Sequence, residues 1–426
     1  MTRVLVVSHT HPRLTRGGAE IAAYEQFRRL KEAPGITAFF LAGNGGWHAR
    51  RSGIVIQRPW GPDEFLADTP GYDHFRHANP NPALAREFGE LLGELKPDIV
   101  HFHHFLGLGV ELFAAVRRHA PQARLLLTLH EYLLPCNHFG QMVTRPDLAL
   151  CTEASPQRCH RCFPEHDPRA FFLRELWLKR FLAEVDLFIA PSRFLLERHV
   201  AWGLPRERFT VLENLLPAAP SAGIPAGPRA GGGPFRAGFF GQLSRLKGVD
   251  VLVRAAELLE ERGVEAVIEL HGTAEHQPES FREHVRKVLE KPPRRLIARG
   301  PYRNDEVTGL MRGVDVVLVP SIWWENSPLI IQEAAAAGRP VIGSDLGGIR
   351  EKLADLPGSM TFRPGDALDL ADRIAAMAAL APQGRTPEPR AAGARLEELL
   401  DLYATLPPLA APEPERAAPK RGRRRA

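Results

Sequence analysis

The sequence contains few cysteines and no long apolar run. All four cysteines lie between positions 136 and 162, so the rest of the chain folds without disulfides. No apolar run reaches the ~18 residues that a membrane span needs. The N-terminal stretch MTRVLVVSHTHP is too short and too soon polar for a signal peptide. Because charged residues make up 25% of the chain and hydrophobic residues 44%, we expect a globular protein with a cytoplasmic location.

Excess charge is nearly absent outside the C-terminal end. The net charge is +5, but residues 413–426 hold six Lys or Arg and two Glu, a net +4 that leaves +1 for the other residues. No nucleic-acid-binding face is therefore expected. The basic tail has two interpretations: peripheral contact with anionic lipid at the inner face of a membrane, or a solvated, disordered end.

Strand patterns alternate with helical patterns in both halves of the chain. The expected strands cover residues 4–8, 98–103, 124–130, 186–190 and 209–212, then 235–240, 266–271, 296–299, 315–320 and 340–343; expected helices include 19–31, 82–95 and 110–119. This alternation predicts two doubly wound, Rossmann-like α/β domains. They are expected at 1–215 and 235–392, joined by a Pro/Gly linker at 216–234 and followed by a final helix at 393–406 and a disordered tail at 407–426.

Polar residues stand where several expected strands end. They are His9, His103, His130, Ser192 and Asn214. Ligands of doubly wound sheets bind beyond the carboxyl ends of the strands, so these side chains mark a candidate cleft. Strand-end histidines can equally be hydrogen-bonded loop residues, and we expect this of His9, His101 and His104.

The most informative stretch is 315–348, DVVLVPSIWWENSPLIIQEAAAAGRPVIGSDLGG, which is typical of strand, loop, helix and strand. Ser327 suits a helix N-cap and Pro328 the first helical position, and a helix start can bind phosphate. Glu325 precedes this start, and Glu333 lies within the apolar helix. Two carboxylates around an anion site suit a nucleotide sugar; the alternative is a solvated loop glutamate and a helix glutamate paired with an arginine.

This stretch resembles the donor-site signature of retaining family 4 glycosyltransferases (glycosyl transferases group 1), which have the GT-B fold. The resemblance rests on Glu325 and Glu333 in E-x7-E spacing and on two flanking segments. These are the dipeptide PS, which precedes Glu325, and EAAAAGRPVIGSDLGG, which begins at Glu333. It implies that Glu325 contacts the transferred sugar and Glu333 the ribose. The backbone at Asn326, Ser327, Pro328 and Leu329 would then bind the diphosphate, in a central cleft between the two domains.

Three further segments are similar to the same family. Gly17 and Gly18, in GGAE, match its glycine loop beside the diphosphate, and His130, in LTLHE, matches the histidine beside the reacting sugar. Lys247, in FFGQLSRLKG, matches its phosphate-binding lysine, whereas Gln242 replaces the usual arginine and Arg245 is a substitute candidate. His103 is a weaker candidate for the acceptor side.

The resemblance implies a retaining transfer of a sugar from a nucleotide-diphosphate donor to a carbohydrate or lipid-linked acceptor, in cell-envelope, exported polysaccharide or glycoconjugate synthesis. His130 and Glu325 would be catalytic, orienting and polarising the sugar. Because no D-x-D motif occurs, no catalytic divalent metal and no other cofactor are expected. Two alternatives remain: a GT-B epimerase or phosphorylase, and a non-catalytic nucleotide-sugar-binding protein whose degenerate site is marked by Gln242.

The cysteines follow the His130 strand in the pattern C-x14-C-x7-C-x2-C. Clustered thiols in a reducing compartment more often bind metal than form disulfides. The sequence therefore leaves two interpretations: a structural zinc site, or four unlinked, partly buried thiols. The residues concerned are Cys136, Cys151, Cys159 and Cys162.

Overall fold

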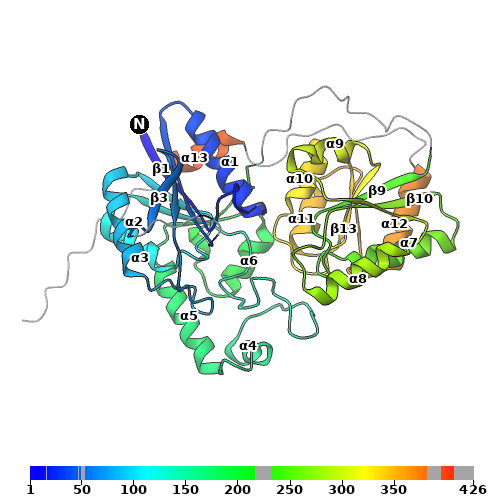
Figure 1. Ribbon diagram of the computed structural model, residues 1–426, viewed down its shortest axis with the longest axis horizontal. Coiled ribbons are helices and arrows are strands. Elements are labelled where there is room, and N and C mark those ends of the chain that lie inside the picture. Colours follow the sequence, from blue (N-terminus) through cyan, green and yellow to red (C-terminus); the bar gives the residue numbers. More distant parts are fainter. Residues whose placement is uncertain (16, 47, 49–52, 216–232, 381–394, 407–426) are drawn as a thin grey trace, which may run out of the picture.

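The computed structural model describes residues 1–15, 17–46, 48, 53–215, 233–380 and 395–406. Its two α/β units lie side by side, each built around one sheet (Figure 1). Most of the expected linker and all of the tail lie outside the described residues, as do 381–394. No helix in the described part of the chain combines the length and apolar character needed to cross a membrane.

The first domain contains an eight-stranded sheet in the order β3-β4-β2-β1-β5-β6-β7-β8, parallel except where β3 pairs with β4. The strands are β1 (Thr2–Ser8), β2 (Ile36–Gly43), β3 (Ile56–Gly61), β4 (Glu64–Ala67), β5 (Ile99–Phe102), β6 (Arg124–Thr128), β7 (Leu187–Ala190) and β8 (Phe209–Val211). Its helices are α1 (Gly18–Glu32), α2 (Pro82–Leu95), α3 (Glu111–His119), α4 (Pro156–Cys162), α5 (Pro168–Leu182) and α6 (Arg193–Ala201).

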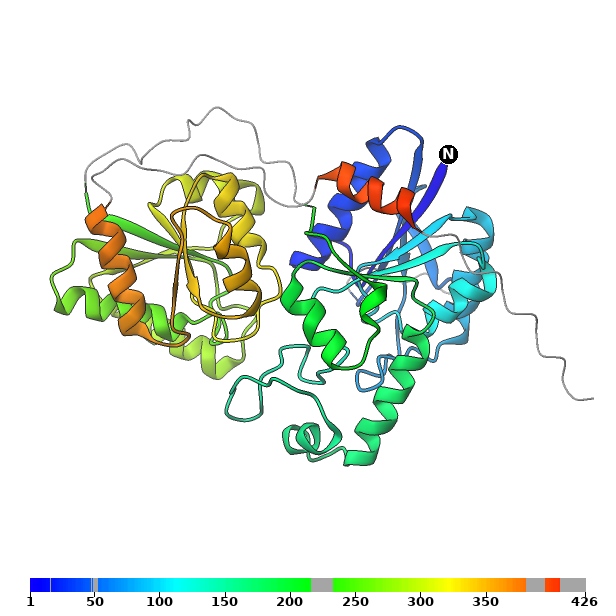
Figure 2. The ribbon, with the colours of Figure 1, turned by 180° about the vertical axis from the view of Figure 1, so that it is seen from behind.

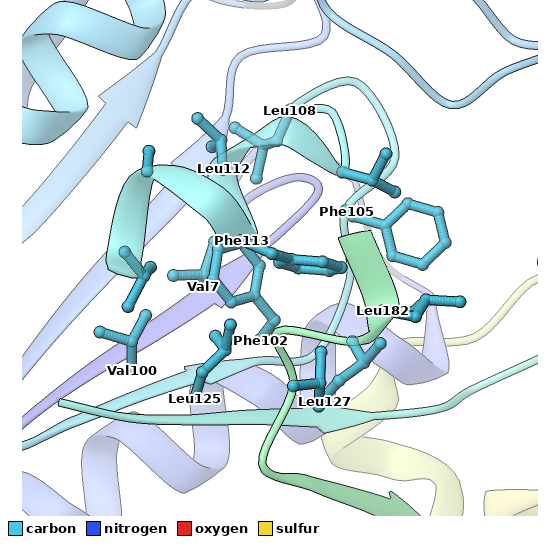
Figure 3. Close-up of a cluster of buried hydrophobic side chains, with 14 of the residues drawn as sticks. Val7, Val100, Phe102, Phe105, Leu108, Leu112, Phe113, Leu125, Leu127 and Leu182 are labelled. Atoms are coloured by element: carbon cyan, nitrogen blue, oxygen red, sulfur yellow. The ribbon is translucent and has the colours of Figure 1, made fainter. Parts of the chain in front are cut away.

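Apolar strand residues of this sheet pack against α3 and α5. Figure 3 shows side chains of β1, β5 and β6 pointing toward Phe113 and Leu112 of α3, with Leu182 of α5 beside them. Phe113 and Phe102 are fully buried, and their rings meet edge to face at 4.9 Å between centroids. Because both faces of a parallel sheet are covered by helices, its strands are apolar runs without alternation.

The second domain contains a six-stranded parallel sheet in the order β11-β10-β9-β12-β13-β14. The strands are β9 (Phe235–Phe240), β10 (Ala266–His271), β11 (Leu296–Gly300), β12 (Val316–Val319), β13 (Val341–Ser344) and β14 (Met360–Phe362). The helices are α7 (Val249–Glu261), α8 (Glu279–Glu290), α9 (Val307–Arg312), α10 (Leu329–Ala336), α11 (Gly347–Ala354) and α12 (Ala367–Leu380). The prediction of two doubly wound sheets is thus confirmed.

The last described helix, α13 (Leu396–Thr405), returns to the first domain. It lies across that domain beside α1 (Figure 2), and its Leu399 is buried with apolar residues of β1 and β2. The C-terminal segment therefore forms part of the first domain's core, although a whole second domain separates them in sequence.

The helix in the 315–348 stretch begins later than expected. α10 starts at Leu329 with Pro328 in the cap position, and no side chain caps it. Ser327 is therefore not the N-cap, because its hydroxyl instead donates to Glu213 Oε1 at 2.7 Å. Strands β2, β3, β4 and β14 were not expected from the sequence either.

Candidate active site

A cavity of about 500 Å³ lies between the two domains, beyond the carboxyl ends of several strands. Residues that follow β1, β6, β9 and β12 line it. Ten of the residues predicted from the sequence are in this lining: Gly17, Gly18, His130, Lys247, Glu325, Asn326, Ser327, Pro328, Leu329 and Glu333.

Two helix starts meet at the cavity, one from each domain. α1 begins at Gly18 and α10 at Leu329, and a Cβ on Gly18 would lie 3.4 Å from the Leu329 side chain. A Cβ on Gly17 would lie 2.6 Å from Glu20 Oε2, closer than real contacts allow. Gly17 thus leaves room for the Glu20 side chain, and Gly18 lies close to Leu329 at the second helix start. Both helix starts present backbone N–H groups and partial positive charge to the same space.

Glu325 is held by three donors in the loop after β12. Its Oε1 accepts from Ser321 at 2.8 Å and from the Trp323 indole at 2.9 Å, and it pairs with Lys247 Nζ at 2.5 Å. The residue is only 6% exposed, so these donors are what make a buried carboxylate tolerable. No group among the described residues donates to Oε2, which leaves this oxygen available to a sugar hydroxyl.

Lys247 reaches the cavity from the loop before α7. Gly248, with φ +77°, fits there because a Cβ would lie 2.0 Å from the Pro320 carbonyl oxygen. The lysine is therefore placed directly against the end of β12, where its ammonium group can contact both Glu325 and an anion in the cavity.

Glu333 is a nearly isolated carboxylate on α10. Its side chain has no hydrogen-bond partner among the described residues, and burial raises its pKa to about 7. A carboxylate without donors in an apolar helix is costly, but two ribose hydroxyls would supply the missing donors.

His130 lies at the end of a chain of buried hydrogen bonds. Its Nε2 is 3.0 Å from His103 Nδ1, and His103 Nε2 is 3.0 Å from Gln26 Oε1. Because burial holds the pKa of His103 well below its usual range, this imidazole is neutral. It donates to Gln26 through Nε2–H and accepts through Nδ1, so the proton shared with His130 belongs to His130 Nε2.

The same chain reaches the C-terminal helix. Gln26 Nε2 donates to His101 Nδ1 at 2.9 Å and to the Tyr403 hydroxyl at 3.1 Å, and Tyr403 is 2.7 Å from His101 Nδ1. Burial also lowers the pKa of His130 to about 4. At neutral pH His130 is therefore an uncharged imidazole whose Nδ1 lone pair has no partner among the described residues.

Asn326 and Ser327 join the two domains. The Asn326 amide donates to the backbone oxygens of Leu129 and His130 at 3.4 and 3.3 Å, and its oxygen accepts from Ser192 at 2.9 Å. Polar groups at the strand ends of the first domain are thus partly hydrogen-bonded to the loop after β12 of the second domain, called the signature loop below because it carries Glu325 and Asn326. The loop in turn packs on Gly348, where a Cβ would lie 1.6 Å from the Asn326 carbonyl oxygen.

Two acid–imidazole pairs also line the cavity, and their carboxylates, Glu20 and Glu131, were not predicted from the sequence. His9 lies 3.3 Å from Glu20, and His104 lies 3.3 Å from Glu131. Burial would lower the pKa of His104, but Glu131 outweighs it and raises the pKa. The expectation that His9, His101 and His104 are hydrogen-bonded agrees with these contacts. Glu20 and Glu131 directly follow the GGA and LTLH segments, which is the only local signal for them.

Two predicted residues lie away from the cavity. Arg245 is exposed, with its guanidinium 3.8 Å from Asp250 and over the Phe281 ring, and does not line the cavity. His103 is buried behind His130, 4% exposed, so the structure places it in support of His130 and not on an acceptor surface. Gln242 does line the cavity, where the similar family carries arginine.

The four cysteines line a second cavity, of about 280 Å³, in the first domain. The cysteine-containing segment contacts the loop after β12, because the Trp324 indole of that loop donates to the Cys151 carbonyl oxygen at 2.9 Å.

Two family models match the chain. The model described as Glycosyltransferase Family 4 matches residues 16–218, and that of Glycosyl transferases group 1 matches residues 234–379. Together they cover both domains.

Curated relatives match over part of their length. A D-inositol 3-phosphate glycosyltransferase of Xylanimonas cellulosilytica is 35% identical over 178 residues, 39% of this chain and 41% of that protein. An uncharacterized 42.6 kDa protein in the cps region of Klebsiella pneumoniae is 22% identical over 279 residues, 65% of each chain. The matches thus span less than two thirds of these relatives.

Solved structures share the fold. Anabaena HepE in complex with UDP superposes with a TM-score of 0.58 at 17% identity, over 95% of this chain and 98% of that one. A sucrose-phosphate synthase from Thermosynechococcus elongatus gives a TM-score of 0.61 at 16% identity, over 91% and 92% of the two chains. These neighbours have the two-domain GT-B arrangement seen here.

Proposed function

We propose that this chain, which belongs to the group 1 glycosyltransferases and has their GT-B fold, transfers a sugar from a nucleotide-diphosphate donor to a carbohydrate or lipid-linked acceptor. One observation carries the proposal: Lys247, two helix starts and the carboxylates of Glu325 and Glu333 line the same cavity between the domains. Cations and N–H groups suit the diphosphate, and the carboxylates suit the hydroxyls at either end.

Departure of the nucleoside diphosphate is the step that most needs stabilisation. As the bond between the sugar C1 and the β-phosphate oxygen breaks, negative charge grows on that phosphate. Lys247 and the N–H groups at the starts of α1 and α10 stabilise this charge from fixed positions. Lys247 pairs with Glu325 before the donor binds, so its ammonium group is already oriented when the phosphate enters the cavity.

The sugar lies between Glu325 and His130 in this proposal. Glu325 Oε2 accepts a hydrogen bond from a sugar hydroxyl while Oε1 remains held by its three donors. His130 offers its Nδ1 lone pair to a second hydroxyl and stays uncharged at neutral pH. Both residues then orient and polarise the sugar.

We further propose that the transfer retains the anomeric configuration and needs no divalent metal. The acceptor oxygen bonds to C1 on the face that the phosphate leaves, and the acceptor proton passes to the departing phosphate oxygen. Lys247 and the helix starts supply the positive charge that a metal would otherwise provide. Relatives named for inositol phosphate and for galactosylglucosyldiacylglycerol synthesis support a hydroxylated or lipid-linked acceptor. We propose that the glycosylated product of this protein belongs to cell-envelope or exported glycoconjugates.

Calorimetric titration with UDP, GDP and ADP in EDTA tests the donor site, with NAD as the negative control. We expect one diphosphate to bind the wild type, and Glu333→Ala to weaken it at least about tenfold through loss of the ribose contacts. Binding in EDTA would support metal independence. Failure of all three diphosphates to bind would favour the degenerate-site alternative that Gln242 suggests.

Product analysis tests the reaction itself. The sugar nucleotide of the base identified by titration is incubated with lipid and carbohydrate acceptors, and proton NMR determines the anomeric configuration of the product. A product with the donor's configuration is expected. An inverted product would contradict retention, and an epimerised or phosphorolysed sugar would assign the cavity to one of those GT-B reactions.

A further inference from the structure

The four cysteines of the chain come together around one cavity, away from the proposed donor site. Cys159 and Cys162 lie one turn apart on α4, on one face of that helix. Cys151 follows the Val143–Leu150 bridge, and Cys136 ends the loop that leaves His130. Although they span 27 positions of sequence, all four line the same space of about 280 Å³.

A buried cation beside the cysteines lacks an anionic partner. Arg174 of α5 is 4% exposed and donates to the backbone oxygens of Phe75, Leu133 and Leu134 at 2.6 to 2.8 Å, and contacts His77. No carboxylate of the described residues lies within ion-pair distance of it. Leu134 lies two residues before Cys136, so its hydrogen bond places the Arg174 guanidinium close to the segment that carries this cysteine. Buried charges are normally paired, so anionic sulfur here would supply the missing partner.

The rim of the cavity also carries more positive than negative charge. Arg145, Arg158 and Arg161 line it together with one carboxylate, Asp147, a net +2. Glu165 and Glu153 lie 3.9 and 3.4 Å from Arg145 and Arg158, in exposed pairs that solvent screens. Zn²⁺ bound by four thiolates carries a charge of −2, which complements the rim and Arg174.

We propose that Cys136, Cys151, Cys159 and Cys162 bind one structural Zn²⁺ as a tetrahedral thiolate site. The described side chains do not yet form a group of three or more ligands close enough to hold a metal. Cys151 Sγ instead donates to the Glu153 carbonyl oxygen at 3.2 Å. A four-thiolate site therefore requires rotation of the thiols about their χ1 bonds and a shift of α4 toward the 136–151 loop.

The zinc site would also stabilise the loop after β12, which carries Glu325. Trp324, adjacent to Glu325, donates to the Cys151 carbonyl oxygen and packs on Phe194 at 5.0 Å between ring centroids. Arg198 donates to the Thr152 carbonyl oxygen next to Cys151. A metal at Cys151 therefore fixes the surface on which Trp324 rests.

Elemental analysis of the full chain, purified without chelator under reducing conditions, tests the proposal. We expect about one zinc per chain in the wild type and loss of most of it in Cys159→Ser/Cys162→Ser, with zinc retained in the matched control Asp147→Asn. Zinc-free wild type, iron in place of zinc, or paired disulfides in the mass of the alkylated chain would overturn it. Loss of zinc from Asp147→Asn would overturn the four-thiolate ligand set.

Limited trypsin digestion of the wild type gives a second readout that needs no variant. Arg158 and Arg161 each precede a proposed ligand, so zinc should protect both bonds. We expect cleavage after these arginines to accelerate at least about tenfold after chelator treatment and to slow again on addition of zinc, but not of magnesium. Equal cleavage rates with and without zinc would contradict a metal in this cavity.

Discussion

At the residue scale, Glu333 couples the proposed ribose contact to pH. Burial raises its pKa from 4.5 to about 7, so near neutral pH the carboxyl group of the empty protein is only partly ionised. The ionised form can accept hydrogen bonds from two ribose hydroxyls, whereas the protonated form has lost part of that capacity. Nucleotide binding should therefore favour proton release from Glu333.

The affinity for the diphosphate is expected to rise as pH increases through 7 and to level off above it. Calorimetry from pH 5.5 to 8.5 should give a Kd at pH 6 roughly tenfold weaker than at pH 8, since ionisation falls tenfold for each pH unit below the pKa. Glu333→Gln is the matched control, because it keeps the phosphate's own titration and removes the carboxyl group. An equally steep profile in this variant would assign the pH dependence to another group.

Lys247 and Arg245 are basic residues two positions apart, and we expect their replacement to have different effects on activity. Lys247 lines the cavity and contacts Glu325, whereas Arg245 lies outside it beside Asp250. Lys247→Met should lower kcat/KM by about 10² or more through loss of charge stabilisation on the leaving phosphate. Arg245→Met should change it less than about twofold. A large loss in Arg245→Met would show that its side chain moves into the cavity when the donor binds.

At the element scale, many but not all of the strands and helices with strong local signals could be predicted from the sequence, since β2 was missed although ITAFFLAG is mostly apolar. α2, β9 and β10 have the expected bounds, and β12 is one residue shorter at each end. β6 ends two residues earlier than expected, and α13 begins three residues later and ends one residue earlier. β3 and β14 were missed, because β3 contains a proline and a tryptophan near polar residues and β14 has only three residues. The α10 start was misplaced because Ser327 bonds to Glu213, 114 residues away, which no local rule includes.

The final helix illustrates what local patterns leave out. Its amphipathic pattern predicts a helix, but not that Tyr403 completes hydrogen bonds to His101, 302 residues earlier, and to Gln26 behind His130. The tautomer of His130 depends on this chain of contacts, whereas its neutral state follows from burial. These contacts follow only when β5, β6, α1 and α13 are placed together.

Removing the Tyr403 hydroxyl should therefore affect both stability and catalysis. In Tyr403→Phe, two buried polar groups each lose a partner, and the free energy of unfolding of the first domain should fall by about 1–2 kcal/mol. We expect a several-fold lower kcat with little change in donor KM, because His130 is less well oriented. Urea denaturation and steady-state kinetics measure these effects.

Thr405→Val is the control on the same helix. Its hydroxyl is exposed and bonds only to backbone oxygens of Asp401 and Leu402, so stability should change by less than about 0.5 kcal/mol. A kcat as low as that of Tyr403→Phe would mean that any perturbation of α13 reduces activity, and that the hydroxyl has no particular role.

At the scale of the whole molecule, the two domains are joined by polar contacts around the cavity. Glu351 of α11 accepts from the backbone N–H groups of Arg193 and Phe194 at 2.8 and 2.9 Å, so a carboxylate of the second domain caps a helix of the first. Lys352 donates to the Pro191 carbonyl oxygen at 2.8 Å and pairs with Glu213. Such contacts exchange readily with water, which suits a cleft that opens for substrate and closes for chemistry.

Glu351 should therefore set how often the cleft is closed. Glu351→Ala removes two charge-assisted hydrogen bonds and an anion at the α6 start, together about 1–2 kcal/mol of interdomain stabilisation. We expect a larger radius of gyration in small-angle scattering without ligand, and a several-fold weaker Kd for the diphosphate, since Glu325 and Glu333 would meet the first domain less often.

Glu257→Ala provides the comparison, because Glu257 lies on α7 and pairs with Arg254 of the same helix. It should leave both the scattering curve and the Kd unchanged. If Glu351→Ala weakens binding without enlarging the protein, then Glu351 acts by local alignment of α6 and α11. If it changes neither quantity, closure depends instead on the Asn326 and Trp324 contacts, which place the signature loop itself against the first domain.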